Sequence, residues 1–310
     1  MADTRDLKSL AKSLACGFES RLRHQTLNMI IDFHTHNFPD ALAPRAIAAM
    51  VENLRHQFVP FGDGTLACQL AAAKADGIDR CVMCPIATKP SQADVILRTA
   101  LDIRDGALGE EAARVIIPLA SVHPADPEFK LKLKAIADAG IPGIKLHPYY
   151  QGFRLGDPSV FPFFAAVRDL GLVVIVHCGF DHGFPDEPMS CGPKEIAVLL
   201  SSVPGLGPLF VAAHLGGHLG SPSGATDMLL ESGCLIDTAC LEMLQDAPEP
   251  IRIMETWPTE RVLFGTDYPW NRQRRLVEWV KAHRPAADYE AIFHENAERI
   301  LGGGPLNLCS

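Results

Sequence analysis

The chain has 310 residues, of which 47% are hydrophobic, and a formal net charge of −9 at pH 7. A chain of this length can form one large α/β barrel domain with an ample buried core. The acidic balance argues against nucleic acid as the main partner, because a phosphate backbone is bound by a basic surface. No apolar run reaches the roughly 18–20 residues that a membrane span requires, so no membrane association is expected.

The first 28 residues and the C-terminal tail lie outside the expected barrel. Residues 1–28 mix acidic and basic side chains and lack the apolar core of a signal peptide, so we expect a cytoplasmic protein. Leu7, Leu10 and Leu14 recur at helical spacing and predict a short amphipathic helix. We therefore expect an N-terminal helical extension over residues 1–28, the main domain over 29–301 and a tail over 302–310.

Eight short apolar segments, mostly rich in Val, Ile and Leu, recur along the chain without the alternation of a half-exposed strand. This pattern is typical of parallel strands buried on both faces. In chain order the segments are Met29–His34, Cys81–Ile86, Val115–Val122, Gly143–His147, Val173–Cys178, Leu209–His214, Cys234–Ala239 and Val262–Asp267. Helix-like stretches occupy residues 41–57, 91–103, 126–140, 162–171 and 192–203 between them, several with start or stop signals.

Eight strands that alternate with helices roughly every thirty residues predict an α/β fold, a single-domain (β/α)8 TIM barrel. An open doubly wound sheet could use the same elements. That fold usually carries a glycine-rich phosphate loop after its first strand, and this chain has His34, Thr35 and His36 there instead.

The nine cysteines are an odd number in a chain without an export signal, so we expect reduced and mostly buried thiols. Cys81 and Cys84 form a C-x-x-C sequence, which in a turn or at a helix start would suggest zinc or redox chemistry. Here it lies in a predicted strand, where residues three apart face opposite ways. We therefore expect two separate core thiols.

Polar side chains end four of the predicted strands. His34 and His36 end the first, His177 the fifth, His214 the sixth and Asp267 the eighth. The carboxyl ends of barrel strands form the face where barrel enzymes keep their active sites. Each residue alone could be an ordinary polar residue at a strand end. Five such residues at one rim would gather polar side chains in a cleft without partners, which favours a common ligand. Imidazole and carboxylate suit a divalent ion such as zinc, which they bind at about 2.0–2.2 Å.

Asp32 precedes these histidines on the first strand. Residues i and i+2 of a strand point to the same face, so we expect Asp32, His34 and His36 on one face. Asp32 would lie one step deeper and hydrogen-bond inside the barrel in support of the metal ligands. Asp237 lies on the seventh strand, and its role stays open between the same support and an ordinary strand end.

Six motifs carry a family resemblance: "DFHTHNFP", "GIKLHPYYQGF", "VHCGF", "AHLGGH", "GTDYPW" and "HENAERIL". With them the chain resembles the amidohydrolase superfamily. It is most similar to the amidohydrolase-related (amidohydrolase 2) branch, which includes aminocarboxymuconate-semialdehyde decarboxylase. The resemblance extends from Met29 to about Leu301. The motifs together are specific for the family and not for one reaction within it.

The resemblance implies one divalent ion, zinc first and manganese second, held by His34, His36, His177 and Asp267 with a water molecule. His214 matches the histidine that orients or deprotonates this water in the branch. A divalent ion lowers the pKa of bound water from 15.7 toward about 7, so hydroxide becomes available at neutral pH. Asp267 would also be catalytic, because it can take the proton of the water and pass it to a leaving group.

Lys145 and His147 share an inward face of the predicted fourth strand, and three roles stay open for Lys145. Binuclear members of the superfamily carry a carbamylated lysine on this strand, so Lys145 could bridge a second metal ion. As a cation it could, with His147, bind a substrate carboxylate or carbonyl. Its amine could also reach solvent at the rim. Further candidates for binding a small acidic or aromatic substrate are Tyr149, Arg154, His182 and Trp270.

The leading hypothesis is a metal-dependent hydrolase that cleaves an amide, lactone or related bond of a small molecule with a metal-activated water. The alternative is a non-oxidative decarboxylase, a lyase that acts on a small carboxylic acid with the same metal shell, and Lys145 and Arg154 would favour it. A TatD-type nuclease fits less well, because such enzymes have an acidic ligand on the fourth strand. A barrel without catalysis fits less well, because the ligand set is complete. Dimers are common in the branch, so the resemblance also suggests a homodimer.

Overall fold

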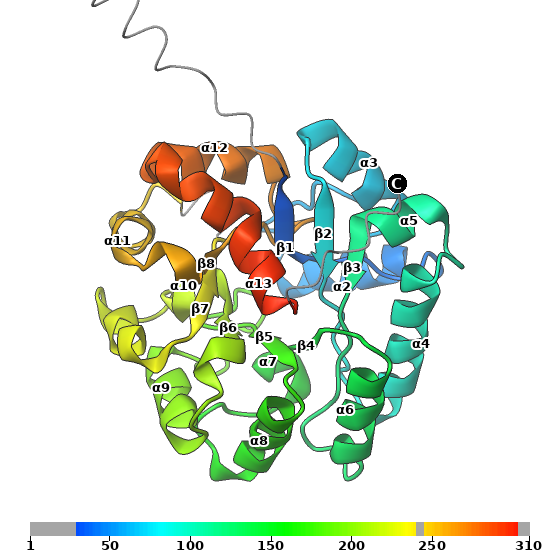
Figure 1. The fold of residues 1–310 in the computed structure, drawn as a ribbon, viewed down its shortest axis with the longest axis horizontal. Helices are drawn as coiled ribbons and strands as arrows, with labels where there is room; N and C mark the ends of the chain where they lie inside the picture. Colours follow the sequence, from blue (N-terminus) through cyan, green and yellow to red (C-terminus); the bar gives the residue numbers. More distant parts are fainter. Residues whose placement is uncertain (1–28, 240–244, 303–310) are drawn as a thin grey trace, which may run out of the picture.

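The computed structural model describes residues 29–239 and 245–302, so the helix expected within residues 1–28 lies outside the described residues. Eight parallel strands form the centre of the molecule and helices surround them (Figure 1). The strands are β1 (Ile31–Thr35), β2 (Arg80–Met83), β3 (Ile116–Pro118), β4 (Gly143–Leu146), β5 (Val173–Val176), β6 (Phe210–Ala212), β7 (Leu235–Asp237) and β8 (Val262–Leu263). Each overlaps the segment predicted for it, and the (β/α)8 fold is confirmed.

Two sheets, ordered β1-β2-β3 and β4-β5-β6-β7-β8, close into one barrel at two seams. At the first seam a parallel bridge joins Ala120 to Ile144. At the second, the Asp267 N–H donates to the His34 carbonyl at 2.8 Å. The first and last strands are therefore neighbours, and their carboxyl ends meet at one rim.

Most helices form the outer layer of the barrel, whereas the short α7 and α10 directly follow β4 and β6 at the rim (Figure 1). They are α2 (Ala43–Asn53), α3 (Leu66–Asp76), α4 (Ala93–Arg104), α5 (Glu110–Val115), α6 (Phe129–Asp138), α7 (Pro148–Gln151), α8 (Phe161–Asp169), α9 (Pro193–Ser202), α10 (Ala213–Gly217), α11 (Pro248–Thr256), α12 (Gln273–His283) and α13 (Asn296–Ile300). The five predicted helical stretches correspond to α2, α4, α6, α8 and α9. Within the described ranges, no helix has both the length and the apolar content of a membrane span.

The strands bury apolar side chains on both faces, as unbroken Val, Ile and Leu runs predict. One cluster fills the barrel interior and includes Phe33, Val82, Cys84 and Ile175. A second, larger cluster packs the strands against the helices and includes Cys81. The two cysteines of the C-x-x-C sequence thus face opposite cores, and the prediction of two separate core thiols is confirmed.

A β-bulge in β1 aims His34 into the barrel. Between Asp32 and Thr35 the strand carries one residue more than its partner β2, so Phe33 and His34 both stand opposite Val82. An extra residue of this kind re-aims the side chains around it, and bulges are common beside active sites. Phe33 packs in the barrel interior, and His34 reaches the centre of the rim above it.

The prediction that Asp32 shares a face with His34 and His36 is wrong, and the bulge is the reason. Asp32 lies on the outer face of β1, where it accepts hydrogen bonds from the Gln273 side chain of α12 at 2.7 Å and from the Thr266 N–H at 2.9 Å. Burial raises the pKa of Asp32 to about 7, and these hydrogen bonds oppose the rise. Asp32 therefore ties β1 to α12 and to the loop after β8 from the outer face of the strand, and it also accepts the His34 N–H at 3.2 Å.

Glu249, in the first turn of α11, fastens the segment after α10 to this helix. Its carboxylate accepts hydrogen bonds from Arg252 at 2.7 Å, from the Gly224 N–H at 2.9 Å and from the Ser223 hydroxyl. The Arg252 contact and these hydrogen bonds lower the pKa of Glu249 to about 2. A carboxyl with a depressed folded-state pKa stabilises the fold above its unfolded pKa, and this stabilisation is lost as the pH falls through the folded value.

We expect Glu249→Gln to lower the free energy of unfolding by about 1–2 kcal/mol at pH 7, less than the full shift implies, because solvent screens the partly exposed Arg252 partner. The difference from the wild type should shrink as the pH falls from 4.5 toward 2. Urea unfolding across this range measures it, with Glu255→Gln at an exposed position of the same helix as the control. A difference that did not change with pH would contradict this role.

Candidate metal centre

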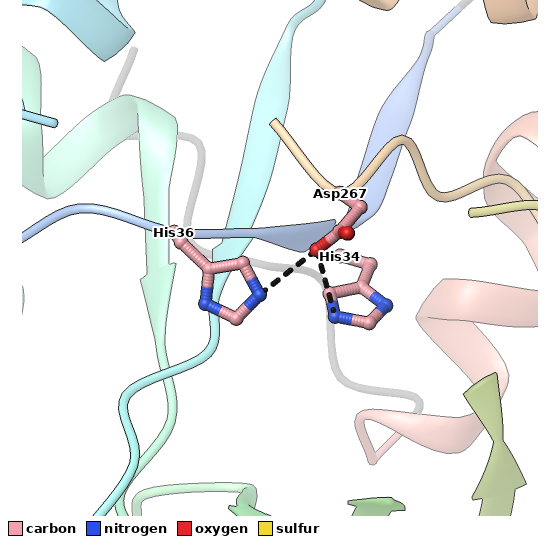
Figure 2. Close-up of side chains that lie close together, drawn as sticks. All are labelled: His34, His36 and Asp267. Atoms are coloured by element: carbon pink, nitrogen blue, oxygen red, sulfur yellow. Dashed lines mark ion pairs between the residues drawn. The ribbon is translucent and has the colours of Figure 1, made fainter. Parts of the chain in front are cut away.

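Three of the predicted metal ligands meet at the carboxyl-terminal rim of the barrel. Asp267 Oδ1 lies 3.0 Å from His36 Nε2 and 3.5 Å from His34 Nε2, and Figure 2 shows the carboxylate facing both rings. The His34 side chain is buried, whereas those of His36 and Asp267 are 14% and 17% exposed. The group is therefore partly accessible to solvent through His36 and Asp267.

The separations within this group fit a shared metal ion. Two ligand atoms about 2.0–2.2 Å from one ion lie about 3.3–3.6 Å apart at a tetrahedral angle and about 2.8–3.1 Å apart at a right angle. The observed 3.5 and 3.0 Å fall in these two ranges. Imidazole nitrogen and carboxylate oxygen are also ligands that zinc and manganese accept.

Each of these imidazoles has its other nitrogen fixed by an acceptor outside the group. His34 Nδ1 lies 2.8 Å from Asp237 Oδ2, and His36 Nδ1 lies 2.9 Å from the Cys84 carbonyl oxygen. Because carboxylates and carbonyls accept hydrogen bonds, the network places the ring protons on Nδ1 and leaves the Nε2 lone pairs toward Asp267. The Lys145 amine lies 2.8 Å from His34 Nε2, and His36 Nε2 lies 3.0 Å from the Asp267 carboxylate, so positive charge is stabilised at this point of the rim. The structure thus answers the open question on Asp237, which supports His34.

His214 lies beside this group in a strained backbone conformation. Its φ of 59° and the φ of 61° at Asp267 lie in the left-handed region, which costs non-glycine residues about 1–3 kcal/mol and is concentrated at functional sites. Asp237 Oδ1 accepts the His214 N–H at 2.9 Å, and His214 Nδ1 lies 2.8 Å from the Ala239 carbonyl oxygen. One buried carboxylate therefore positions His34 with one oxygen and His214 with the other.

His177, the fourth predicted ligand, lies beside His214 and outside the group formed by the other three ligands. Its Nδ1 is 2.9 Å from His214 Nε2, so the inward nitrogens of these two rings face each other. Its ring stacks on His147, with centroids 4.0 Å apart and planes 16° apart. The role of His177 as a metal ligand stays a prediction.

Asp181 belongs to a second cluster, and the sequence analysis missed it. Its Oδ2 lies 3.2 Å from His147 Nε2 and 3.8 Å from His177 Nε2, and its Oδ1 accepts the Gly183 N–H at 2.7 Å. Ligand-type atoms of His147, His177 and Asp181 all lie within 4.8 Å of one another. The signal that could have found Asp181 is its spacing, because it follows His177 by four residues in the loop after β5.

Lys145 points into the barrel from β4, as predicted, and is 1% exposed. The alternative of an amine that reaches solvent at the rim is therefore wrong, because the strands around it enclose the side chain. Its Nζ lies 2.8 Å from His34 Nε2, on the side where the ligand group meets. Within residues 29–239 and 245–302, no carboxylate forms an ion pair with Lys145.

Burial and neighbouring charges set the protonation states that a metal site requires. Burial and the nearby Lys145 hold the pKa of His34 well below its usual value, and burial with neighbouring imidazoles does the same for His177. Burial would raise the pKa of Asp267, but the close contact with the His36 ring and the adjacent imidazoles hold it below its usual range. Neutral imidazoles and an ionised carboxylate are the states in which these groups bind metal ions.

Two of the predicted substrate-binding residues lie beside the centre. His147 is stacked on His177, and the Tyr149 ring stands edge-on to His177 with centroids 5.9 Å apart. The Tyr149 hydroxyl donates to the Gly179 carbonyl at 3.1 Å, which fixes this ring at the start of the loop after β5. Both rings therefore lie against the predicted ligand His177.

The structure does not bring Arg154, His182 and Trp270 to the ligand group. Arg154 is half exposed and donates to the Met189 carbonyl at 3.2 Å. His182 packs against Phe58, with ring centroids 5.0 Å apart. Trp270 lines a separate cleft of about 760 Å³, and the described residues that line this cleft include none of the predicted metal ligands.

Comparison with solved structures finds barrels of the same fold. An uncharacterized TIM-barrel protein from Bordetella bronchiseptica is 20% identical, with a TM-score of 0.65 over 88% of this chain and 98% of that chain. The 5-carboxyvanillate decarboxylase from Sphingomonas paucimobilis is 15% identical, with a TM-score of 0.62 over 88% and 98% of the two chains. The 5-carboxyvanillate decarboxylase from Novosphingobium aromaticivorans, complexed with manganese and 4-hydroxy-3-methoxy-5-nitrobenzoic acid, is 16% identical, with a TM-score of 0.59 over 88% and 96%.

No curated protein matches the chain. A family model described as Amidohydrolase matches residues 31–303, which include the whole barrel and every predicted metal ligand. The match agrees with the resemblance seen in the sequence motifs. The chain therefore belongs to the amidohydrolase family.

Proposed function

We propose that the chain is a metal-dependent decarboxylase of a small, acidic and aromatic substrate, with one divalent ion held by His34, His36, His177 and Asp267. The observation that carries the proposal is the buried amine of Lys145, which lies 2.8 Å from His34 Nε2 and forms no direct ion pair with a carboxylate among the described residues, while the buried Asp237 is close enough to interact with its charge. A buried ammonium requires a counter-charge. A substrate carboxylate bound against the metal ligands supplies that charge.

Aromatic side chains beside the centre support an aromatic substrate. The Tyr149 ring stacks on Phe184 with centroids 5.4 Å apart, and the Tyr150 ring stands edge-on to Phe184 at 4.8 Å. Tyr150 also stands edge-on to His147 at 4.7 Å, so these rings continue from the centre into the loop after β5. Flat, rigid rings of this kind contact an aromatic acid over a large area at little entropic cost.

The comparisons support the decarboxylase, which the sequence analysis placed second, over the hydrolase. Both named relatives among the three solved structures are carboxyvanillate decarboxylases, and one of them is complexed with manganese and a substituted benzoic acid. At 15% and 16% identity these likenesses show the fold alone. The proposed substrate class rests on Lys145 and the aromatic side chains.

In the proposed reaction the bond between a substrate carbon and its carboxyl group breaks, carbon dioxide leaves, and the carbon takes up a proton. Lys145 binds and orients the carboxylate before the bond breaks. His214 delivers the proton through Nε2, because Nδ1 is held by the Ala239 carbonyl while Nε2 lies 2.9 Å from His177 Nδ1 at the rim. A divalent ion bound there supplies positive charge to the oxygen atoms of the substrate.

A hydrolase of an amide or lactone is the second candidate. The ionised Asp267 carboxylate favours it, because Oδ1 lies at the middle of the ligand group and can accept a proton from water. The two candidates differ in their products. Only the decarboxylase releases carbon dioxide.

We expect Asp267→Ala and His177→Ala each to lose stoichiometric metal, because each removes one of four proposed ligands. Elemental analysis of the purified proteins measures ions per chain. His123→Ala, which removes a partly buried histidine outside the group, serves as the control. Retention of one ion per chain in both variants would show that the ligand set is wrong.

We expect Lys145→Met to reduce carbon dioxide release from substituted benzoic acids by about 10²–10³-fold, the usual effect of removing one preorganised donor, while one ion per chain stays bound. Release of carbon dioxide from a panel of hydroxylated benzoic acids measures this effect, and Lys134→Met, at an exposed position of α6, is the control.

Two other outcomes would contradict this proposal. Hydrolysis of lactones or amides without carbon dioxide release from any acid would favour the hydrolase. Two ions per chain in the wild type, falling to one in Lys145→Met, would assign Lys145 to a second metal ion, as in the binuclear members of the superfamily.

A further inference from the structure

The cluster of His147, His177 and Asp181 has no part in the proposed bond breaking, yet it is closely built. The side chains of His147 and Asp181 are 9% and 13% exposed, and that of His177 is 13% exposed. Two of its ring nitrogens, Nδ1 of His147 and Nε2 of His177, are buried and have no hydrogen-bond partner. The Oδ2 atom of Asp181 faces the Nε2 atoms of both rings, at 3.2 and 3.8 Å.

The ring stacking argues against a second metal ion in this cluster. An imidazole binds an ion along the lone pair in its ring plane. The two planes are nearly parallel, at 16°, and the ring centroids are 4.0 Å apart. A single ion at about 2.0–2.1 Å from both nitrogens could not lie in both planes. One carboxylate can face both rings in this arrangement, with His147 Nε2 at 3.2 Å and His177 Nε2 at 3.8 Å, because its negative charge acts in a broad range of directions.

The nitrogen of His177 that faces the centre is Nδ1, because it lies 2.9 Å from His214 Nε2. A neutral imidazole that binds a metal ion through Nδ1 must carry its proton on Nε2. At His34 and His36 the outward ring nitrogen has an acceptor at 2.8–2.9 Å. At His177 the outward nitrogen faces Asp181, whose carboxylate is held by the Gly183 N–H at 2.7 Å and by His147.

We propose that Asp181 is a positioning residue, which holds the ring proton of His177 on Nε2 and so leaves the Nδ1 lone pair free for the metal ion. This proposal rests on the metal centre proposed above. His147 anchors Asp181 through its Nε2 and keeps the His177 ring in place by stacking on it. Asp181 acts through its negative charge at 3.8 Å from His177 Nε2, whereas Asp237 contacts His34 Nδ1 at 2.8 Å.

The test compares zinc affinities of the full-length wild type, Asp181→Ala, Asp181→Asn and Asp186→Asn by competition with a chromophoric chelator. We expect Asp181→Ala to bind zinc about 10- to 100-fold more weakly, the usual effect of removing an outer-shell partner. Asp181→Asn keeps an oxygen acceptor and should fall between Asp181→Ala and the wild type. Asp186→Asn, a matched change at an exposed position of the same loop, should bind like the wild type.

A second readout separates positioning from a general loss of structure. The visible absorption of the cobalt-loaded protein reports the number and geometry of its ligands. This absorption should change in Asp181→Ala and stay unchanged in Asp186→Asn. Thermal unfolding of the metal-free variants shows whether they are folded, and Asp181→Asn supplies the comparison if Asp181→Ala is not.

Wild-type zinc affinity in Asp181→Ala and Asp181→Asn would overturn the positioning role. If Asp267→Ala also kept wild-type affinity, the metal centre itself would be wrong, so the two failures are distinguishable. A fall from two zinc ions to one in Asp181→Ala would show that the cluster binds a metal ion and would likewise overturn the proposal.

Discussion

The arrangement of the rim depends on one buried carboxylate, that of Asp237. It is fully buried at the end of β7, and it faces His34 Nδ1 with one oxygen and accepts the N–H groups of His214 and Ala239 with the other. Burial raises its pKa, while the nearby His214 and Lys145 oppose the rise. Removing one partner from a buried charge costs about 3–5 kcal/mol, so His34 and the strained His214 are held in a fixed relation.

Most of the fold could be predicted from the sequence because burial on both faces leaves a readable pattern. The strand Val173–Val176 is entirely apolar and is followed directly by His177, so the apolar run identifies both the strand and the polar residue at the rim. The same logic located His214 and Asp267. It could not locate α3, because its alanine-rich sequence shows no clear apolar stripe.

The rest of the site depends on contacts between distant segments, which periodicity does not encode. The β1 bulge appears only when β1 is paired with β2, and it alone sends Asp32 outward and His34 inward. Lys145 is a charged residue in a short strand, and only barrel closure shows that it is buried beside His34. Asp181 lies in a loop, where its spacing of four residues from His177 is the one signal in the sequence, and its role emerges only from the stacked rings that it faces.

Because β1 and β8 meet at one seam, a bound metal ion would also affect the folding and the stability of the chain. His34 and His36 are made early in synthesis and Asp267 late, so the proposed ligand set exists only after the last strand has paired with the first. An ion bound there would stabilise the pairing between β1 and the segment after β8. By mass action, metal at about a hundredfold excess over its dissociation constant adds about 2.7 kcal/mol to the stability of the closed barrel. A cell that runs short of metal would then lose the enzyme to opening and proteolysis as well as to inactivity.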